Sequence, residues 1–335
     1  MSTPSSVGDL GEHGLIALIR DRVPAAPRWI AIGLGDDAAV VEPARNTFDV
    51  LTTDALVEGV HFDRAFTPAA AIGHRAMAVN LSDLAAMGAT PRVALLSLVL
   101  PPDLAVADLA AMVDGLLAVA AAHGVALVGG NITRSPGPLM LDVTAVGAVR
   151  PRRLLARSGA RPGDQVWVSG AIGAATAGMA SLASGAPRDA RMAACEAAFL
   201  TPEPRVRLGR LLGGNRAASA CVDLSDGLAD GLHQLAQASG VGFEIDAREV
   251  PVPEAAREWF AAHGDDSLLP AMTGGDDYEL LFTVRPRTRR RMETVRRQAR
   301  QVPLTRIGMV VAGREVTLVD GGARAPLPPG YVHFR

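Results

Sequence analysis

Short apolar runs, bounded by glycine, proline or aspartate, recur along the whole chain. In the first half, runs rich in β-formers predict strands at 29–32, 38–41, 48–53, 93–100, 125–128 and 139–149. Apolar residues at helical spacing predict two helices, over 69–88 and 104–123. Gly88 is a suitable stop for the first of these helices. The first half therefore reads as a mixture of strands and helices.

The segment 150–153, Arg-Pro-Arg-Arg, interrupts this pattern and marks the predicted boundary between two domains, 1–150 and 151–335. Beyond it, strands are predicted at 165–169, 220–222, 243–246, 279–284, 305–311 and 315–319. Helices are predicted up to about residue 212, over 228–239 and over 287–300, the last opened by Pro286. Strands and helices mix in both halves, which predicts a two-domain α+β protein.

Composition supports a folded protein with two cores. The chain has 335 residues, of which 49% are hydrophobic and 20% charged, which suits two domains of roughly 150 residues each. A net charge of −2 gives no general reason to bind nucleic acid or an anionic membrane. The most apolar region, 93–130, is interrupted by prolines and aspartates, and the N-terminus lacks a signal-type apolar core. We therefore expect a cytoplasmic protein, with Cys195 and Cys221 as reduced, buried thiols.

The sequence contains no lysine, so all 33 basic residues counted as Lys+Arg are arginine. A Walker A loop and a protein-kinase fold each need a lysine on the phosphates, and a Schiff-base enzyme needs an amine. These classes are excluded. Any phosphate chemistry must depend on metal ions, arginine and backbone N–H groups.

Aspartate recurs in one local setting, just past an apolar run and beside glycine, serine or threonine. The instances are Asp36–Asp37, Asp54, Asp83, Asp223 with Asp226, and Asp276–Asp277. Most have an ordinary explanation: residues 33–37 suit a hairpin turn, and Asp54, Asp223 and Asp226 suit helix caps. If the fold gathers these carboxylates, their mutual repulsion requires cations, which points to several metal ions.

Asp83 is harder to explain as a turn or a cap. It lies in the middle of the predicted helix 69–88, where aspartate has poor propensity, and it shares a face with Asn80. Gly129-Gly130-Asn131 follows a predicted strand and could cradle a phosphate, although glycine pairs are common. The basic helix 287–300 lacks interleaved aromatic residues, so a solvated face is favoured over nucleic-acid binding.

The ordered motifs resemble one family, the thiamine-monophosphate kinases of the aminoimidazole ribonucleotide synthetase-like superfamily. The resemblance is carried by Gly-Leu-Gly-Asp-Asp-Ala-Ala (33–39), Thr-Thr-Asp-Ala-Leu-Val-Glu-Gly-Val-His-Phe (52–62), Ala-Val-Asn-Leu-Ser-Asp-Leu-Ala-Ala-Met-Gly-Ala (78–89), Arg-Ser-Gly-Ala-Arg-Pro-Gly-Asp (157–164), Asp-Leu-Ser-Asp-Gly-Leu (223–228) and Gly-Gly-Asp-Asp-Tyr-Glu-Leu (274–280). It implies ATP-dependent phosphorylation of thiamine monophosphate to thiamine diphosphate, assisted by several Mg²⁺ ions. It also implies an N-terminal domain that dimerises through its sheet and binds ATP, and a C-terminal α+β domain that closes over the site.

The same resemblance implies roles for individual residues. The Mg²⁺ ligands would be Asp37, Thr52, Thr53, Asp54, Asp83, Asp223 and Asp226. The nucleotide would contact Gly130, Asn131, Arg157 and Ser225, and the thiamine phosphate would contact His61, Asp276 and Tyr331. No catalytic base is expected, because the acceptor is already a phosphate anion. Arg157 is the candidate for charge stabilisation.

Two positions depart from the family pattern. Asn131 stands where the family often has aspartate, and Asp276 stands where it often has glutamate. Three alternatives stay open: another enzyme of the superfamily, a non-catalytic sensor of nucleotide or thiamine phosphate, and a metal-dependent phosphatase. A selenophosphate synthetase would be expected to carry a Cys and a Lys near the N-terminus, and hydrogenase-maturation relatives to end in a cysteine. This sequence has neither feature.

Overall fold

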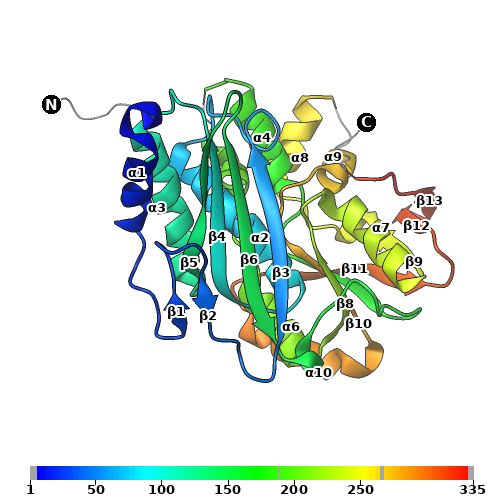
Figure 1. The fold of residues 1–335 in the computed structure, drawn as a ribbon. Coiled ribbons are helices and arrows are strands. Elements are labelled where there is room, and N and C mark those ends of the chain that lie inside the picture. Colours follow the sequence, from blue (N-terminus) through cyan, green and yellow to red (C-terminus); the bar gives the residue numbers. More distant parts are fainter. Residues whose placement is uncertain (1–5, 188, 265–267, 331–335) are drawn as a thin grey trace. The chain divides into compact units, whose positions relative to one another are not determined.

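The computed structural model describes residues 6–187, 189–264 and 268–330. Its contacts divide the chain into two compact units (Figure 1). The N-terminal unit contains residues up to Leu84 together with Thr90–Ala148, and the C-terminal unit contains Ala85–Ala89 together with the chain from Val149 onward. Each unit is described by itself.

The N-terminal unit is built around a four-stranded sheet in the order β3-β6-β4-β5, with a small hairpin of β1 and β2 beside it (Figure 1). Its elements are α1 (Val7–Arg20), β1 (Ile30–Ile32), β2 (Val40–Val41), β3 (Phe48–Val57), α2 (Ala69–Ala86), β4 (Thr90–Leu100), α3 (Val106–His123), β5 (Ala126–Arg134) and β6 (Met140–Val149). Strands β4 and β5 are parallel, and β4 and β6 are antiparallel.

The two faces of this sheet differ in burial. Along β6, Leu141, Val143 and Ala145 are buried, whereas Asp142 and Thr144 between them are partly exposed. This alternation places one row of side chains under the helices and the other on an open face. Large apolar side chains also lie exposed in this unit, among them Leu51 of β3 with 69% of its surface accessible.

The sequence predicts no segment that is long and uncharged enough to cross a membrane, and helix α3 departs from that expectation. Over Val106–His123 it is long and apolar enough, by length and composition alone, to do so. It also carries Asp108 and Asp114, and residues such as Leu109, Met112 and Leu116 are buried. Core helices of globular proteins pass the same test of length and composition, and these buried side chains are typical of a core helix.

The C-terminal unit contains a seven-stranded sheet in the order β13-β12-β9-β11-β7-β10-β8. Its strands are β7 (Gln165–Ser169), β8 (Ala218–Asp223), β9 (Gly242–Asp246), β10 (Leu280–Val284), β11 (Leu304–Val311), β12 (Val316–Asp320) and β13 (Ala323–Pro326). Its helices are α4 (Ala174–Ala183), α5 (Ala193–Leu200), α6 (Val206–Gly214), α7 (Gly227–Ser239), α8 (Glu254–Ala262), α9 (Leu268–Thr273) and α10 (Arg289–Gln298), with 3₁₀ turns η1 (Pro151–Arg153), η2 (Ala190–Met192), η3 (Ala247–Glu249) and η4 (Pro286–Thr288).

The main core of this unit lies where Val166 and Val168 of β7 meet the apolar faces of α4, α7, α8 and α9. Trp167 points to the opposite face, where the Arg296 guanidinium of α10 lies 5.7 Å from the ring centroid. Both cysteines are free and buried, as the sequence predicts, and burial raises the pKa of each thiol.

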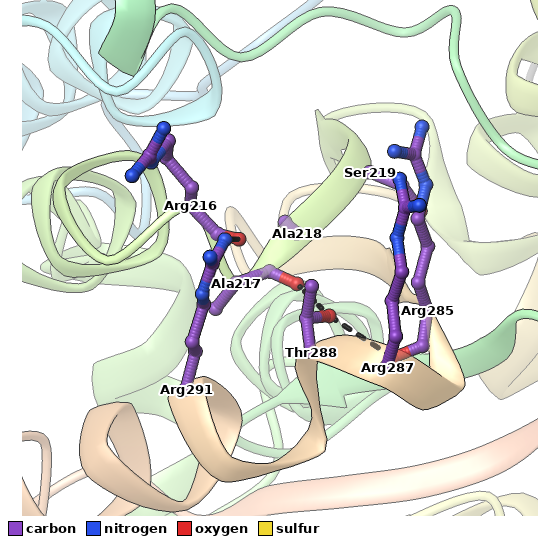
Figure 2. Close-up of a pocket in the computed structure, with 8 residues that line it drawn as sticks. All are labelled: Arg216, Ala217, Ala218, Ser219, Arg285, Arg287, Thr288 and Arg291. Carbon is purple, nitrogen blue, oxygen red and sulfur yellow. Dashed lines mark hydrogen bonds between the residues drawn. The ribbon is translucent and has the colours of Figure 1, made fainter.

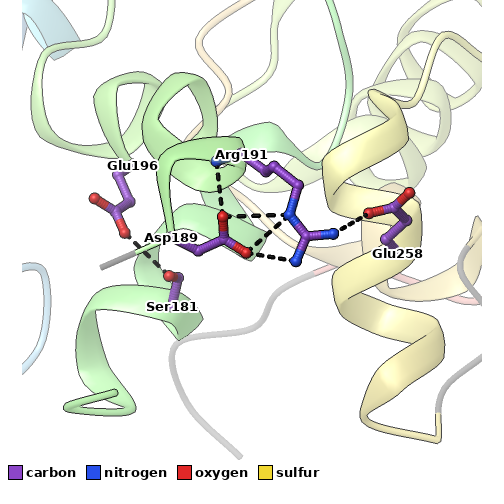
Figure 3. Close-up of polar contacts among 5 residues, drawn as sticks. All are labelled: Ser181, Asp189, Arg191, Glu196 and Glu258. Carbon is purple, nitrogen blue, oxygen red and sulfur yellow. Dashed lines mark hydrogen bonds and ion pairs between the residues drawn. The ribbon is translucent and has the colours of Figure 1, made fainter. Parts of the chain in front are cut away.

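One polar cluster links η2 to α8 at the surface (Figure 3). Asp189 accepts a hydrogen bond from the backbone N–H of Arg191 at 2.9 Å and ion-pairs with its guanidinium at 2.7 Å. The same guanidinium reaches Glu258 of α8 at 3.4 Å. These side chains are exposed, so water screens the ion pairs and the cluster contributes little to stability.

Three local expectations change. Strand β3 runs on to Val57, so Asp54 lies inside a strand and the helix-cap interpretation is wrong. Strand β5 likewise runs through Gly129, Gly130 and Asn131, where we expected a loop after the strand. The helix predicted over 287–300 is shorter, because Pro286 opens a 3₁₀ turn and α10 begins at Arg289.

Candidate active site

In the N-terminal unit, β3 and α2 bring together two of the predicted metal ligands. Thr52 donates a hydrogen bond from its hydroxyl to the carboxylate of Asp83, which lies in the last turn of α2. By strand alternation Asp54 points to the same face as Thr52. Asp83 therefore has Thr52 as a hydrogen-bond partner, and the two side chains place several oxygen atoms close together in the N-terminal unit.

The open face of the sheet holds a second row of polar groups. Thr53 donates a hydrogen bond to Asp142 Oδ1 of β6 at 3.0 Å. Asp142 lies opposite Ser97 of β4, and Ser97 lies opposite Asn131 of β5. Directly paired residues point to the same face, so the row Thr53, Asp142, Ser97 and Asn131 crosses all four strands.

Asp142 was not among the residues singled out from the sequence. Its only sequence signal is an acid within the alternating apolar run 139–149, which by itself reads as an outward-facing strand position. Strand register gives it significance, because it puts a carboxylate on the face that carries Asn131.

The lack of a side chain at Gly130 allows β5 to pair closely with β4. A Cβ at this position would lie 1.9 Å from the carbonyl oxygen of Leu96, the residue paired with it. Only glycine permits that approach. A structural requirement of the sheet therefore accounts for this glycine, whatever it does toward a nucleotide.

Two further candidates lie in turns of the N-terminal unit. Asp37 is exposed in the loop that joins β1 to β2, as the hairpin interpretation of residues 33–37 predicts, and its N–H donates to Asp36 Oδ1 at 2.8 Å. His61 follows β3, and its Nδ1 accepts a hydrogen bond from the Val57 N–H at 3.1 Å. A neutral ring held in this way carries its proton on Nε2, the nitrogen that can donate to an anion.

In the C-terminal unit, the segments 223–227 and 274–279 lie side by side. The Asp276 N–H donates to the Ser225 carbonyl at 2.7 Å, and the Tyr278 N–H donates to the Leu224 carbonyl at 2.9 Å. Asp223 ends β8 and is buried, and Asp226 precedes α7 without making a side-chain capping bond. The fold thus brings together Asp223, Ser225, Asp226 and Asp276, which are 53 positions apart at the extremes.

The backbone of the second segment is strained. Asp276 and Tyr278 adopt φ angles of 68° and 49°, in the left-handed region that side chains other than glycine rarely occupy. The Tyr278 hydroxyl donates to Asp276 Oδ1 at 3.0 Å, which helps to hold the turn. Such conformations cost free energy and persist where the surroundings fix them, which is common at binding sites.

The Asp277 side chain lies at the start of α4. Its carboxylate accepts hydrogen bonds from the Gly173 and Ala175 N–H groups at 2.7 and 3.2 Å. Burial raises the pKa of Asp277 to about 8, and the charges of Glu279 and Asp276 add to this, whereas the two N–H donors oppose it. Asp277 is a structural residue that joins the acidic turn to α4.

A buried ion pair supports the same turn. Arg205 donates to both carboxylate oxygens of Glu279, at 2.7 and 2.6 Å, and the Ser169 hydroxyl donates to Glu279 as well. Burial lowers the pKa of Arg205, but hydrogen bonding and the charge of Glu279 outweigh this and leave it raised. Arg205 therefore stays charged, and its bonds to Glu279 fix the end of the turn against β7.

The remaining candidates are Arg157 and Tyr331. Arg157 is exposed and follows Ala156, whose carbonyl accepts a hydrogen bond from the Cys221 N–H of β8, so this segment runs beside the strand that ends at Asp223. Tyr331 lies outside the described residues. A Cβ at the preceding Gly330 would lie 2.5 Å from the Asp226 carbonyl oxygen, which places the chain next to the acidic loop just before Tyr331.

Within the described parts of the chain, no three side chains of His, Cys, Asp or Glu are close enough together to hold a metal ion by themselves. The candidate acids instead occur singly or in pairs, with threonine and serine hydroxyl groups between them. This arrangement is typical of Mg²⁺ sites, in which one or two carboxylates bind the ion together with substrate phosphates.

Comparison with known proteins identifies the family. Residues 35–149 match the profile of the AIR synthase related protein, N-terminal domain, and residues 161–321 match that of the C-terminal domain. The thiamine-monophosphate kinase of Rhodopirellula baltica is 34% identical over 331 residues, which cover 96% of this chain and 97% of the relative. That of Escherichia coli K12 is 38% identical over 335 residues, which cover 97% and 98%. The chain belongs to the thiamine-monophosphate kinase family.

Solved structures agree with this assignment. Thiamine-monophosphate kinase from Stenotrophomonas maltophilia K279a is 39% identical, with a TM-score of 0.80 over 93% of this chain and 95% of that one. The complex of AaThiL with AMPPCP and TMP is 34% identical, with a TM-score of 0.77 over 99% and 100%. Hydrogenase maturation protein HypE in complex with ATP shares the fold, at 21% identity and a TM-score of 0.80. The predicted two-domain α+β fold of the aminoimidazole ribonucleotide synthetase type is confirmed.

Proposed function

We propose that this chain transfers the terminal phosphoryl group of ATP to the phosphate of thiamine monophosphate, giving thiamine diphosphate and ADP. The family assignment supports this activity, as does the likeness to a relative solved with AMPPCP and TMP. The observation that carries the proposal is the pairing of the segments 223–227 and 274–279, which brings predicted ligands of metal, nucleotide and substrate to one place in the C-terminal unit.

The reaction needs charge neutralisation more than acid–base catalysis. A phosphate oxygen of the acceptor forms the new P–O bond as the bond between the γ-phosphorus and its bridging oxygen breaks, and no acceptor proton has to be removed. The chief obstacle is repulsion between two polyanions. We assign Arg157 to charge stabilisation on the nucleotide side, with Gly130, Asn131 and Ser225 as further nucleotide contacts. We assign His61, Asp276 and Tyr331 to the thiamine phosphate.

The donor atoms fit Mg²⁺. Asp37, Thr52, Thr53, Asp54, Asp83, Asp223 and Asp226 offer only oxygen, the ligand atom that this ion prefers, and neither cysteine is among them. Bound Mg²⁺ supplies neutralisation of phosphate charge and alignment of the reacting groups. The hydrogen bond from Thr52 to Asp83 orients that carboxylate, and the register of β3 fixes Thr53 and Asp54 on opposite faces of the strand.

We also propose that Asp142 supplies the carboxylate that the family pattern places at position 131. Asn131 offers a neutral amide oxygen, and the register carries its row across Ser97 to Asp142, which contacts Thr53. A carboxylate on this face restores negative charge near the neutral amide. Thr53, one of the predicted ligands, would then be held by an acid rather than by another neutral group.

The exposed apolar residues of the N-terminal unit support a homodimer formed through its sheet. Leu51 and Leu95 are large apolar side chains on the open face of the sheet, with 69% and 40% of their surfaces exposed. Exposed apolar side chains that gather on one face mark an interaction surface. We further infer a cytoplasmic location, because both thiols are free and buried and the substrates are those of intracellular metabolism.

One assay tests the activity. Purified protein is incubated with ATP, Mg²⁺ and thiamine monophosphate, and thiamine diphosphate and ADP are measured together. Equal amounts of both products are expected. Loss of thiamine monophosphate without ATP consumption would indicate a phosphatase, and binding of both ligands without product would indicate a sensor.

The variant Asp83→Asn tests the metal assignment in the same assay. The amide oxygen can still accept the Thr52 hydroxyl, so the fold should persist, whereas loss of the negative charge weakens Mg²⁺ binding. We expect turnover to fall by at least roughly a hundredfold, with an unchanged circular dichroism spectrum. Activity near that of the wild type would show that Asp83 is not an essential ligand.

A further inference from the structure

A cavity in the C-terminal unit is lined by four arginines, and its lining includes none of the candidate residues of the kinase site. Its volume is about 360 Å³, and its lining comprises Arg216, Ala217, Ala218, Ser219, Arg285, Arg287, Thr288 and Arg291. Figure 2 shows Arg285 and Arg287 on one side of the segment 217–218 and Arg216 and Arg291 on the other, with the Arg291 guanidinium at the Arg216 carbonyl. The volume is within the range of small-molecule sites.

Hydrogen bonds fix the backbone that carries these arginines. The Thr288 hydroxyl, at the end of η4, donates to the Ala217 carbonyl at 3.1 Å and so ties the start of α10 to the start of β8 (Figure 2). Arg291 donates to the Arg216 carbonyl at 3.3 Å. Arg216 itself adopts a left-handed φ of 51°. Two segments about 70 residues apart in sequence are thereby held as the two walls of one cavity.

The four arginines lack carboxylate partners among the described residues, whose ion pairs all involve other arginines. Arg285 donates one bond to the Gly159 carbonyl at 3.3 Å, while its Nε is buried and has no hydrogen-bond partner in the described structure. Among the lining residues, Ser219 contacts an acid: its hydroxyl donates a hydrogen bond to Asp164 at 2.7 Å. Asp164 is buried behind the lining and also accepts the Arg161 N–H at 3.1 Å.

Like charges gathered at one cavity repel one another, and an anion with several oxygens relieves that repulsion while accepting many hydrogen bonds. Arginine suits this role because its planar guanidinium pairs with phosphate through two parallel bonds. No aromatic side chain lines the cavity, so there is no platform on which a nucleic-acid base could stack. A small, partly open cavity without stacking groups favours a compact phosphate anion over a polynucleotide.

We propose that this cavity binds a diphosphate or triphosphate group as a second anion site, separate from the kinase reaction. The ligand is inorganic polyphosphate or the polyphosphate end of a small molecule. Recognition is by charge and by guanidinium geometry.

Binding of inorganic pyrophosphate and tripolyphosphate tests the proposal. Isothermal titration calorimetry is carried out on the full-length protein in EDTA, so that Mg²⁺-dependent binding at the kinase site is suppressed. The probe variant is Arg287→Gln/Arg291→Gln, and the matched control is Arg290→Gln/Arg297→Gln. The control removes the same charge from exposed positions outside the lining. We expect saturable binding of one anion, weakened at least roughly tenfold by the probe variant and by less than about twofold by the control.

Three outcomes would overturn the proposal. Wild-type protein that binds neither anion at millimolar concentration would show that the cavity is a solvated basic surface. Equal weakening in both variants would show that net charge alone is responsible. Competition by a single-stranded oligonucleotide that binds more tightly than either anion would assign the surface to nucleic acid. The kinase assay on the same variants, with no added polyphosphate, shows that the site is separate if turnover is unchanged.

Discussion

At the scale of single residues, strand register places Asn131 and Asp142 in one row on the same face of the sheet. The sequence shows only that an expected aspartate is an amide. The structure shows that Asp142 shares its face, with Ser97 between them. Asp142 lies two strands from Asn131 and points in the same direction, so our proposal requires that the metal be reached from β6 and not from β5.

The variants Asp142→Asn and Asn131→Asp test this exchange by metal binding. Loss of the carboxylate should weaken Mn²⁺ binding roughly tenfold, measured by electron paramagnetic resonance of free Mn²⁺ in the presence of ATP. The double variant should recover most of that loss, because a carboxylate returns to the same row. Asp49→Asn removes a more exposed acid of β3 and should have little effect. If Asp142→Asn binds Mn²⁺ like the wild type, Asp142 has no role at the metal.

Asp277 gives a prediction for stability against pH. Its pKa is raised from 3.8 to about 8 in the folded protein, so between these values the folded chain holds a proton that the unfolded chain has lost. The stabilisation is complete below pH 3.8 and is lost as the pH rises toward 8, by at most about 1.4 kcal/mol for each pH unit.

Urea unfolding at pH 5, 6.5 and 8, without Mg²⁺, measures this effect against Asp277→Asn. The asparagine can still accept one of the two N–H groups at the start of α4 and does not titrate. The difference in unfolding free energy between wild type and variant should therefore shrink as the pH rises. A difference that stays constant or grows with pH would show that Asp277 is ionised in the fold, as its two N–H donors favour.

At the scale of elements, periodicity predicted the cores of most strands and helices but not their ends. The runs over 69–88, 104–123 and 228–239 became α2, α3 and α7 with small shifts at their ends. Asp54 and Gly129 through Asn131 were misplaced, because aspartate and glycine usually end strands and here the ladder continues through them. The ladder continues because β3 and β5 each have a neighbouring strand, β6 and β4, with which these residues pair. Sequence also could not reveal that residues 223–227 meet 274–279, since that pairing depends on long-range backbone hydrogen bonds.

Gly130→Ala tests whether β5 needs glycine for packing. The added Cβ would collide with the Leu96 carbonyl oxygen, which belongs to the backbone and cannot move aside cheaply. We expect a loss of about 1–3 kcal/mol in unfolding free energy, measured by urea titration. Gly137→Ala is the matched control, because a Cβ there has no atom within 4 Å and the φ angle is not in the left-handed region. Equal effects in the two variants would remove the packing explanation.

At the scale of the whole molecule, the two units divide the candidate residues between them. The N-terminal unit carries Asp37, the Thr52–Asp54 segment and Asp83, and the C-terminal unit carries Arg157 and the acidic loops. The N-terminal sheet has one face under helices and one open face with large apolar side chains. This face carries the polar row as well as Leu51 and Leu95, and our proposed association with a second copy would remove these two apolar side chains from water.

Leu51→Glu tests the dimer. Leu51 is the most exposed of the large apolar side chains in the described structure, at 69%, and strand alternation places it on the open face with Thr53. In a two-fold dimer one substitution introduces two charges into the same interface, so its effect is doubled. Sedimentation equilibrium should show a dimer for the wild type and a monomer for the variant at micromolar concentration. Met309→Glu, which changes an exposed apolar residue of the C-terminal unit, should remain dimeric. A wild-type protein that sediments as a monomer, or a Leu51→Glu protein that still sediments as a dimer, would exclude this face as the interface.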